Sequence, residues 1–203
     1  MKTAGIFVFK GSSLVALCLT SAISLLGFLW PFFVTEKQGH PQWIFLLAAP
    51  FALLTLMTSI SNKLFDAKTI ALLAVLSALV AALRPMGTGA VGIEPMWFIL
   101  ILAARVFGPG FGLTLGTSGT FFSAFLTGGF GPWLAYQMFA AGWLGLFAGL
   151  LPKRISGRRE IAMLVVYGIF ASFLFGLLMD LQFWPWAIGA NTQLSFAPMA
   201  PLA

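Results

Sequence analysis

Long apolar runs, separated by short polar or Gly- and Pro-rich breaks, dominate the pattern along the chain. The first run, residues 12–34, has 23 residues, which suffices for a membrane-crossing helix and exceeds the core of a cleaved signal peptide. Lys2 and Lys10 precede it. A lipid anchor on Cys18 is the weaker alternative, because Leu17 stands where a lipoprotein signal needs a small residue.

The later runs predict six more membrane helices and, with the first, an all-α, polytopic membrane helical bundle. Asp66 is expected to cap the third helix, and Gly108-Pro109 separates the fourth from the fifth. The tail, residues 182–203, is aromatic and Pro-rich and predicts no further span. The expected boundaries of the six helices are 43–61, 67–84, 96–107, 110–127, 133–151 and 161–181.

The segment Met96–Phe107 is short for a membrane span, since 12 residues extend only about 18 Å against a hydrocarbon core of about 30 Å. The positive charges favour a crossing nevertheless. With seven spans, only Lys37 and Arg84 lie outside the cell, which is a strong positive-inside bias. We therefore expect a multi-pass cell-membrane protein with a cytoplasmic N-terminus. The basic residues then expected inside are Lys2, Lys10, Lys63, Lys68, Arg105, Lys153, Arg154, Arg158 and Arg159.

The composition excludes several classes of protein. Of the 203 residues, 60% are hydrophobic and only 8% are charged, too few to cover a soluble globule. A soluble enzyme, a disordered protein and a nucleic-acid binder are therefore ruled out. The net charge of +6 is first an orientation signal, with attraction of residues 153–159 to anionic lipid as a secondary effect.

Catalytic chemistry finds little support in the sequence. Residues 116–119 match the Gly-x-Ser-Gly of rhomboid-type intramembrane proteases, but the only histidine, His40, precedes the motif, so Ser118 is interpreted as a packing residue. One histidine and one cysteine on different segments make no metal site. No phosphate-binding Walker motif is present, so any ATP hydrolysis requires another chain. We expect no catalytic residue, no metal and no cofactor.

Small residues recur four apart on three helices, which permits close helix contact in a membrane. For the two glycine-containing stripes we expect packing on each other, because their helices are adjacent. The alanine stripe can also serve as a docking surface for a partner helix. The stripes are Ala74-Ala78-Ala82, Gly108-Gly112-Gly116-Thr120-Ala124 and Ala141-Gly145-Gly149.

Residues 74–151 resemble the substrate-binding (S) component of energy-coupling factor (ECF) vitamin transporters, and the resemblance extends from about residue 67 to the end of the chain. The motifs that carry it are ordered and spaced as in that family. They are the alanine stripe running into Arg84-Pro85, and residues 106–112 (VFGPGFG), 128–133 (GGFGPW), 137–143 (QMFAAGW) and 145–150 (GLFAGL).

The resemblance implies a six-helix membrane protein that captures a vitamin-like small molecule from outside. It also implies docking on a transmembrane coupling (T) subunit that is powered by two ATPase subunits. The family's docking motif maps onto Ala74, Ala78 and Ala82.

The chain departs from the family pattern in two respects. Residues 1–66 add two helices of unknown role ahead of the S-component-like domain, residues 67–203. That domain shows five helices where the family has six, and it ends where the sixth is expected to begin. The sequence is therefore expected to be a fragment that lacks the last helix.

A candidate ligand site lies on three segments expected outside the cell, residues 84–96, 127–137 and 180–203. Aromatic walls with a few polar groups suit a flat heterocycle. An alternative interpretation is that Trp43, Trp97, Trp133 and Trp184 form an interfacial belt without any ligand. Arg84 and Glu94 would then pair with each other or reach lipid headgroups. The substrate-binding candidates are Arg84, Glu94, Trp133, Tyr136, Gln137, Asp180, Trp184 and Asn191.

Three functions remain open from the sequence. The leading one is the S component of an ATP-driven importer, with the vitamin undetermined. The runner-up is a stand-alone secondary transporter, which the absence of acidic residues in mid-membrane disfavours. The third is a membrane scaffold subunit that binds no ligand.

Overall fold

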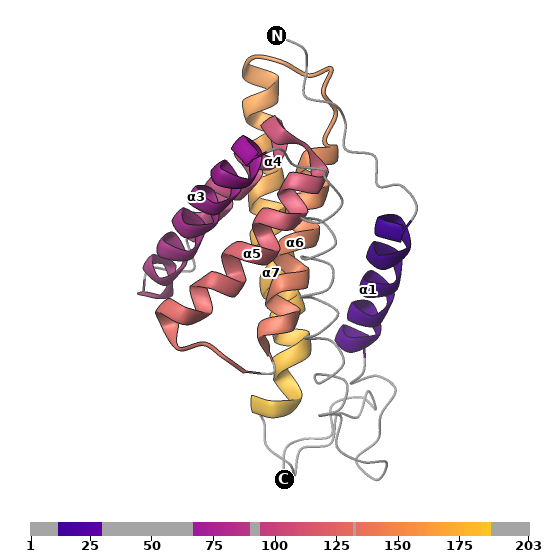
Figure 1. The fold of residues 1–203 in the computed structure, drawn as a ribbon, viewed down its shortest axis with the longest axis vertical. Helices are drawn as coiled ribbons and strands as arrows, with labels where there is room; N and C mark the ends of the chain where they lie inside the picture. The colour runs from indigo at the N-terminus through magenta and orange to yellow at the C-terminus, as the bar shows by residue number, and fades with distance from the viewer. Residues whose placement is uncertain (1–11, 30–66, 90–93, 132, 188–203) are drawn as a thin grey trace, which may run out of the picture.

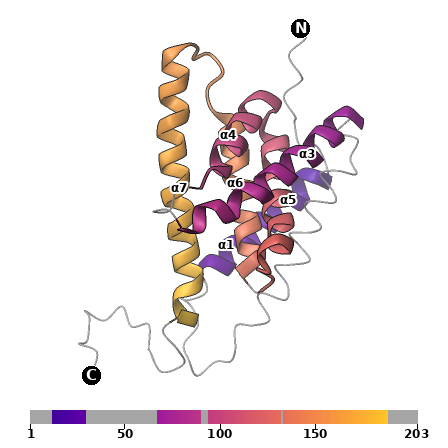
Figure 2. The same cartoon turned by 90° about the vertical axis from the view of Figure 1, so that its left-hand side faces the viewer.

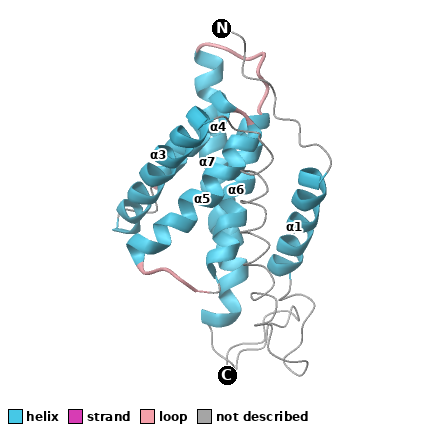
Figure 3. Cartoon of the chain, viewed as in Figure 1, coloured by secondary structure: helices cyan, strands magenta, loops and turns pink. Residues whose placement is uncertain are grey.

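The computed structural model describes residues 12–29, 67–89, 94–131 and 133–187, and within these ranges the chain forms helices and no strands (Figures 1 and 3). The all-α fold class is therefore confirmed for the described part of the chain. The helices are α1 Ser12–Leu29, α3 Ala67–Leu83, the 3-10 helix η3 Arg84–Gly89, α4 Met96–Phe107, α5 Pro109–Thr127, α6 Trp133–Leu150 and α7 Arg158–Ala187.

The expected helix boundaries agree with the structure to within a few residues, with two differences. The segment after α3, expected as a loop, begins with η3, and α7 spans Arg158–Ala187 instead of 161–181, so it extends into the expected tail. Gly157 has a φ of 64° and its carbonyl accepts bonds from Glu160 and Ile161 N–H groups, so α7 starts within the basic segment. The helix expected at residues 43–61 and the Asp66 cap lie outside the described residues.

Three of the described helices are long and apolar enough to cross a membrane, namely Ala67–Gly87, Trp133–Leu150 and Arg158–Leu181. The segment Met96–Phe107 is helical over the expected residues but is shorter. These helices support a membrane-embedded bundle, and the count of seven spans stays a prediction.

Successive helices from α3 to α7 alternate in direction, so that the end of α3, the start of α4, the end of α5 and the start of α6 lie toward one end of the bundle (Figures 1 and 2). We call this the η3 end. The connection between α6 and α7 lies at the opposite end, and α7 runs the length of the bundle along one edge (Figure 2). The connections between helices therefore form two clusters, one at each end of the bundle, which would lie on opposite sides of the expected membrane.

The α5–α6 pair forms the centre of the bundle, and glycine permits its close contact. A Cβ atom built on Gly112 would lie 2.2 Å from the Gly145 carbonyl oxygen, and one on Gly116 would lie 2.3 Å from that of Ala141. Gly149 meets the backbone of Pro109 in the same way, at 2.4 Å. The expectation that the two glycine-containing stripes pack on each other is confirmed.

Buried hydroxyl groups along α5 donate to carbonyls one turn earlier, so they are satisfied without water. Thr114 donates to the Gly110 carbonyl over 2.9 Å, and Thr117 to that of Leu113 over 2.8 Å. Ser118 Oγ lies 2.7 Å from Ser77 Oγ of α3 and is buried. This contact confirms the interpretation of Ser118 as a packing residue.

Helix α3 has two different faces. Leu73, Ser77 and Val80 point into the bundle and are buried. Gly119 of α5 faces Val80 so closely that a Cβ there would lie 2.4 Å from a Val80 methyl group. The alanine stripe (Ala74, Ala78 and Ala82) lies on the other face, and all three residues are exposed.

Candidate functional site

Arg84 and Glu94 come together at the η3 end of the bundle. Arg84 Nη1 donates to Ser123 Oγ of α5 over 2.7 Å, which ties the start of η3 to the last turns of α5. Ser123 in turn donates to the Thr120 carbonyl over 2.7 Å. The guanidinium is near enough to Glu94 for the two charges to interact. The two side chains nevertheless form no direct ion pair in the described part of the chain, and the partner that Arg84 has is the Ser123 hydroxyl, which sequence reasoning missed.

Glu94 is a half-buried carboxylate immediately before α4. Burial raises the pKa of Glu94 above its ordinary value, whereas the Arg84 charge and a hydrogen bond from the Trp97 side chain act in the opposite direction. Its Oε2 atom is buried and has no hydrogen-bond partner among the described residues. A buried carboxylate oxygen without a partner is costly, so this atom is suited to accept a bond from a ligand.

Trp97 lies in the interior and not in an interfacial belt. Only 5% of its surface is exposed, and its ring packs edge-on against Phe175 of α7, with centroids 5.1 Å apart. The belt interpretation is therefore wrong for this residue. The interpretation failed because the position of a tryptophan within a span does not show whether a neighbouring helix covers its ring.

Three candidates from the start of α6 lie near the same end but differ in surroundings. Trp133 and Gln137 are half-buried, and the Trp133 indole lies over Gly131. Tyr136 is fully buried, with Phe28 of α1 packed edge-on against its ring at 5.0 Å. Helix α1 thus covers part of α6, a contact that the sequence did not reveal.

The remaining candidates are not placed beside Arg84 and Glu94. Asp180 is exposed on α7. Trp184 belongs to the last turns of α7, but its side chain lies outside what the structure describes, as does Asn191. The described part of the chain therefore brings together Arg84 and Glu94 from the predicted set, with Ser123 and Trp97 added.

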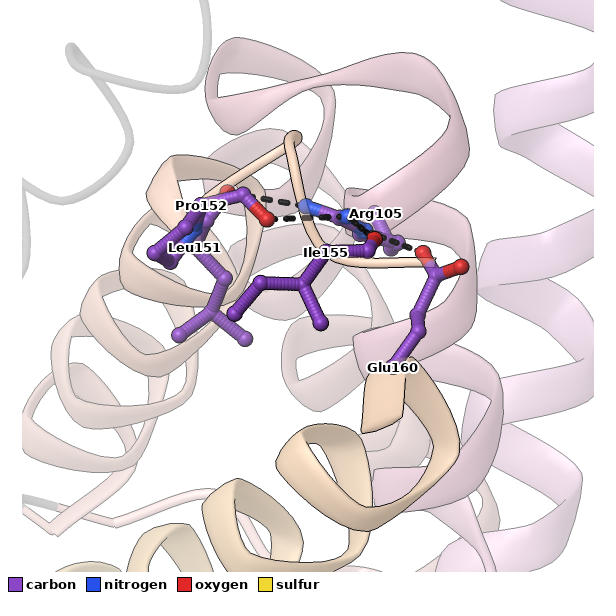
Figure 4. A network of polar contacts seen from close by, with 5 residues as sticks. All are labelled: Arg105, Leu151, Pro152, Ile155 and Glu160. Atoms are coloured by element: carbon purple, nitrogen blue, oxygen red, sulfur yellow. Dashed lines mark hydrogen bonds and ion pairs between the residues drawn. The ribbon is translucent and has the colours of Figure 1, made fainter. Parts of the chain in front are cut away.

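The opposite end of the bundle holds a second polar network, centred on Arg105 in the last turn of α4 (Figure 4). Its Nε donates to Glu160 Oε1 over 2.8 Å, and its Nη1 to the Leu151 carbonyl over 2.8 Å. Nη2 donates to the carbonyls of Pro152 and Ile155 over 3.1 and 3.5 Å. We call this network the Arg105 clamp, because it fastens the α6–α7 connection to α4.

Metal chemistry has no visible site in the described ranges, where no group of three or more His, Cys, Asp and Glu residues is placed to hold an ion. Ser118 is engaged with Ser77 and with the Thr114 carbonyl. The site residues that the structure describes can bind a ligand through charge, hydrogen bonds and aromatic surface.

The sequence was compared with known protein families, curated proteins and solved structures. The family described as the ECF-type riboflavin transporter, S component, matches residues 64–197. The curated proteins and the solved structures gave no match. The match spans α3 to α7 and begins close to where the resemblance was expected to begin. The chain therefore belongs to the S-component family of ECF-type riboflavin transporters.

Proposed function

We propose that this chain is the substrate-binding subunit of an ATP-driven importer and captures riboflavin, or a close flavin relative, at the η3 end. The family to which it belongs is a family of transporter subunits, which are not enzymes. The positive-inside bias favours an η3 end outside the cell and a cytoplasmic N-terminus. Residues 1–66 then precede the transport domain as two additional helices.

The observation that carries the proposal is the exposed alanine face of α3. Ala74, Ala78 and Ala82 lie outward while the opposite face of the same helix packs on α5. In lipid, small side chains gain little by facing acyl chains, but they let another helix approach closely. A transmembrane coupling subunit, driven by two ATPase subunits, is the partner that we assign to this face.

The proposed substrate suits the chemistry of the η3 end. A flavin has a flat tricyclic ring with apolar faces and an edge of alternating donors and acceptors. Arg84 supplies donors and Glu94 an acceptor with one buried, unpartnered oxygen among the described residues. Trp133 and Gln137, half-buried at the start of α6, are the further binding residues that we propose.

Bulk added to the alanine face tests the docking step. Ala78→Leu should abolish ATP-dependent uptake of labelled riboflavin in cells or in vesicles that contain the coupling subunits, while binding to the purified protein stays unchanged. Ile169→Phe is the matched control, because Ile169 is exposed on α7, away from the stripe. Undiminished uptake by Ala78→Leu would sink the docking assignment, and uptake without ATP would indicate a secondary transporter.

Substitution of the charged pair tests the binding site. Arg84→Gln and Glu94→Gln should each weaken riboflavin binding by about tenfold or more, since each removes a charge-assisted hydrogen bond. Quenching of flavin fluorescence on titration with purified protein measures this affinity. Lys68→Gln, which removes an exposed charge at the other end of α3, should leave it unchanged. Equal affinities for all three variants would place the ligand elsewhere, and no flavin binding by the unmodified protein would contradict the substrate.

A further inference from the structure

An apolar groove runs along the first turns of α7, beside the end of α6. It has a volume of about 480 Å³ and presents almost no polar surface. Tyr167 is anchored in its floor, because its hydroxyl donates to the Leu144 carbonyl over 2.5 Å. The groove is lined by Leu151, Ala162, Met163, Val166, Tyr167 and Phe170.

Two cationic residues precede this groove on α7, at the start of the same helix. Arg158 precedes Ala162 by four residues and Arg159 precedes Met163 by four, and residues four apart share a helix face. Both arginines are exposed, as are Lys153 and Arg154 in the preceding segment. None of the four forms an ion pair with another residue of the described ranges.

The Arg105 clamp explains why these charges stay available. Glu160 is the nearest acid in sequence, and its carboxylate is already paired with Arg105 (Figure 4). The same guanidinium binds carbonyls of the connecting segment, including those of Leu151 and Pro152. The nearest carboxylate is therefore already engaged, and the four basic side chains have no ion-pair partner among the residues that the structure describes.

The dimensions of the surface fit one leaflet of a bilayer. From Arg158 to Phe170 the helix rises about 18 Å, close to half of a hydrocarbon core of about 30 Å. The cations lie at the polar end of this length, and the apolar lining lies below them. Positive charge followed by an apolar trough complements a molecule with an anionic head and a hydrocarbon tail.

We propose that this surface binds an anionic phospholipid, with the phosphate at Arg158 and Arg159 and an acyl chain in the groove. The cationic residues at one end of the groove and its almost wholly apolar lining match the two parts of such a lipid, its phosphate and its acyl chain. The site is independent of the proposed transport function, since it lies at the end opposite to Arg84 and Glu94.

Native mass spectrometry of the full chain tests the proposal, after exchange into detergent with defined amounts of phosphatidylglycerol or phosphatidylcholine of the same acyl chains. We expect stronger retention of phosphatidylglycerol. Arg158→Gln with Arg159→Gln should reduce its affinity about thirtyfold, toward that of phosphatidylcholine. Ala162→Phe, which fills the groove, should weaken retention of both lipids.

Two matched controls separate a built site from general attraction. Lys68→Gln removes an exposed cation away from the groove, and Val165→Phe adds bulk at an exposed α7 position that does not line it; both should retain lipid normally. Equal retention of the two lipids, or equal loss in Lys68→Gln and the arginine variant, would overturn the proposal. Unchanged retention of phosphatidylglycerol by Ala162→Phe would also overturn the proposal. Loss of a bound protein by that variant would point to a protein occupant of the groove instead.

Riboflavin binding distinguishes this proposal from the function proposed above. The arginine and Ala162 variants should bind riboflavin as the unmodified protein does. A protein that binds no riboflavin but retains phosphatidylglycerol selectively would contradict the transport proposal alone. Selective riboflavin binding with no lipid preference would contradict the lipid site alone.

Discussion

The same spacing of small residues has opposite consequences on α5 and on α3. On α5, Gly112 and Gly116 face α6 so closely that an added Cβ would meet a carbonyl oxygen at 2.2 or 2.3 Å. On α3, Ala74, Ala78 and Ala82 are exposed. One stripe is therefore filled by a neighbour within the chain, and the other is left open.

The difference teaches that a small-residue stripe indicates a close helix contact without identifying the partner. Helix α5 is surrounded by α3, α4 and α6, and its buried hydroxyls donate to backbone carbonyls, while Ser118 also contacts Ser77 and Ser123 accepts a bond from Arg84. Around the alanine stripe the exposed neighbours are large and apolar, with Val75 65% and Leu79 40% exposed. An apolar border around a flat face is compatible with lipid and with a partner helix.

The largest effect is expected at the α5–α6 contact. Gly116→Ala should lower stability by about 1–3 kcal/mol, because a Cβ would overlap the Ala141 carbonyl and force the helices apart. Gly176→Ala on α7 is the matched control, since a Cβ there meets nothing within 4 Å. It should be neutral or stabilise by up to about 1 kcal/mol. Thermal unfolding in detergent measures both, and equal melting temperatures would show that the close contact is not required.

A smaller effect is expected where the inner face of α3 meets α5. Ser77 Oγ and Ser118 Oγ lie 2.7 Å apart and are buried. A double-mutant cycle with Ser77→Ala and Ser118→Ala should give a coupling of about 0.6 kcal/mol, which is typical of hydrogen bonds between membrane helices. No coupling would mean that the hydroxyls are satisfied by their own backbone carbonyls.

The smallest effect on stability is expected on the outer face of α3. Ala78→Leu should change the free energy of unfolding by less than about 0.5 kcal/mol, because the side chain is exposed. The contrast with Gly116→Ala would sharpen the distinction between the two stripes. A large loss of stability would show that the alanine face is covered within the chain, and uptake defects in this variant would then report misfolding.

Much of the fold could be predicted from the sequence because apolar runs and Gly-Pro breaks mark helix ends in a membrane chain. The short helix Met96–Phe107 was expected at its observed boundaries, and Pro109 occupies the first position of α5, where proline is favourable. The start of α7 was missed because Arg158 and Arg159 are charged. Charged residues can extend a helix beyond its apolar stretch, and hydropathy does not indicate a helix there.

The candidate site was less predictable, because contacts between distant residues decide it. Arg84 and Glu94 were paired from proximity in sequence, but Ser123 is 39 residues from Arg84 and carries no signal of its own. Phe28 is similarly remote from Tyr136, which it buries. Aromatic residues near span ends look alike in the sequence, and packing separates those that are buried from those that remain accessible.

The shortness of α4 has a consequence for the thickness of the transport barrier. The Arg105 clamp fixes one end of α4 to the basic α6–α7 connection. A helix of 12 residues rises about 18 Å, so with the clamp at one surface of a hydrocarbon core of about 30 Å the start of α4 would lie about 12 Å short of the other surface. On the function proposed above, a solute would reach Arg84 and Glu94 through a local depression at that surface, and the distance left to cross would be correspondingly shorter.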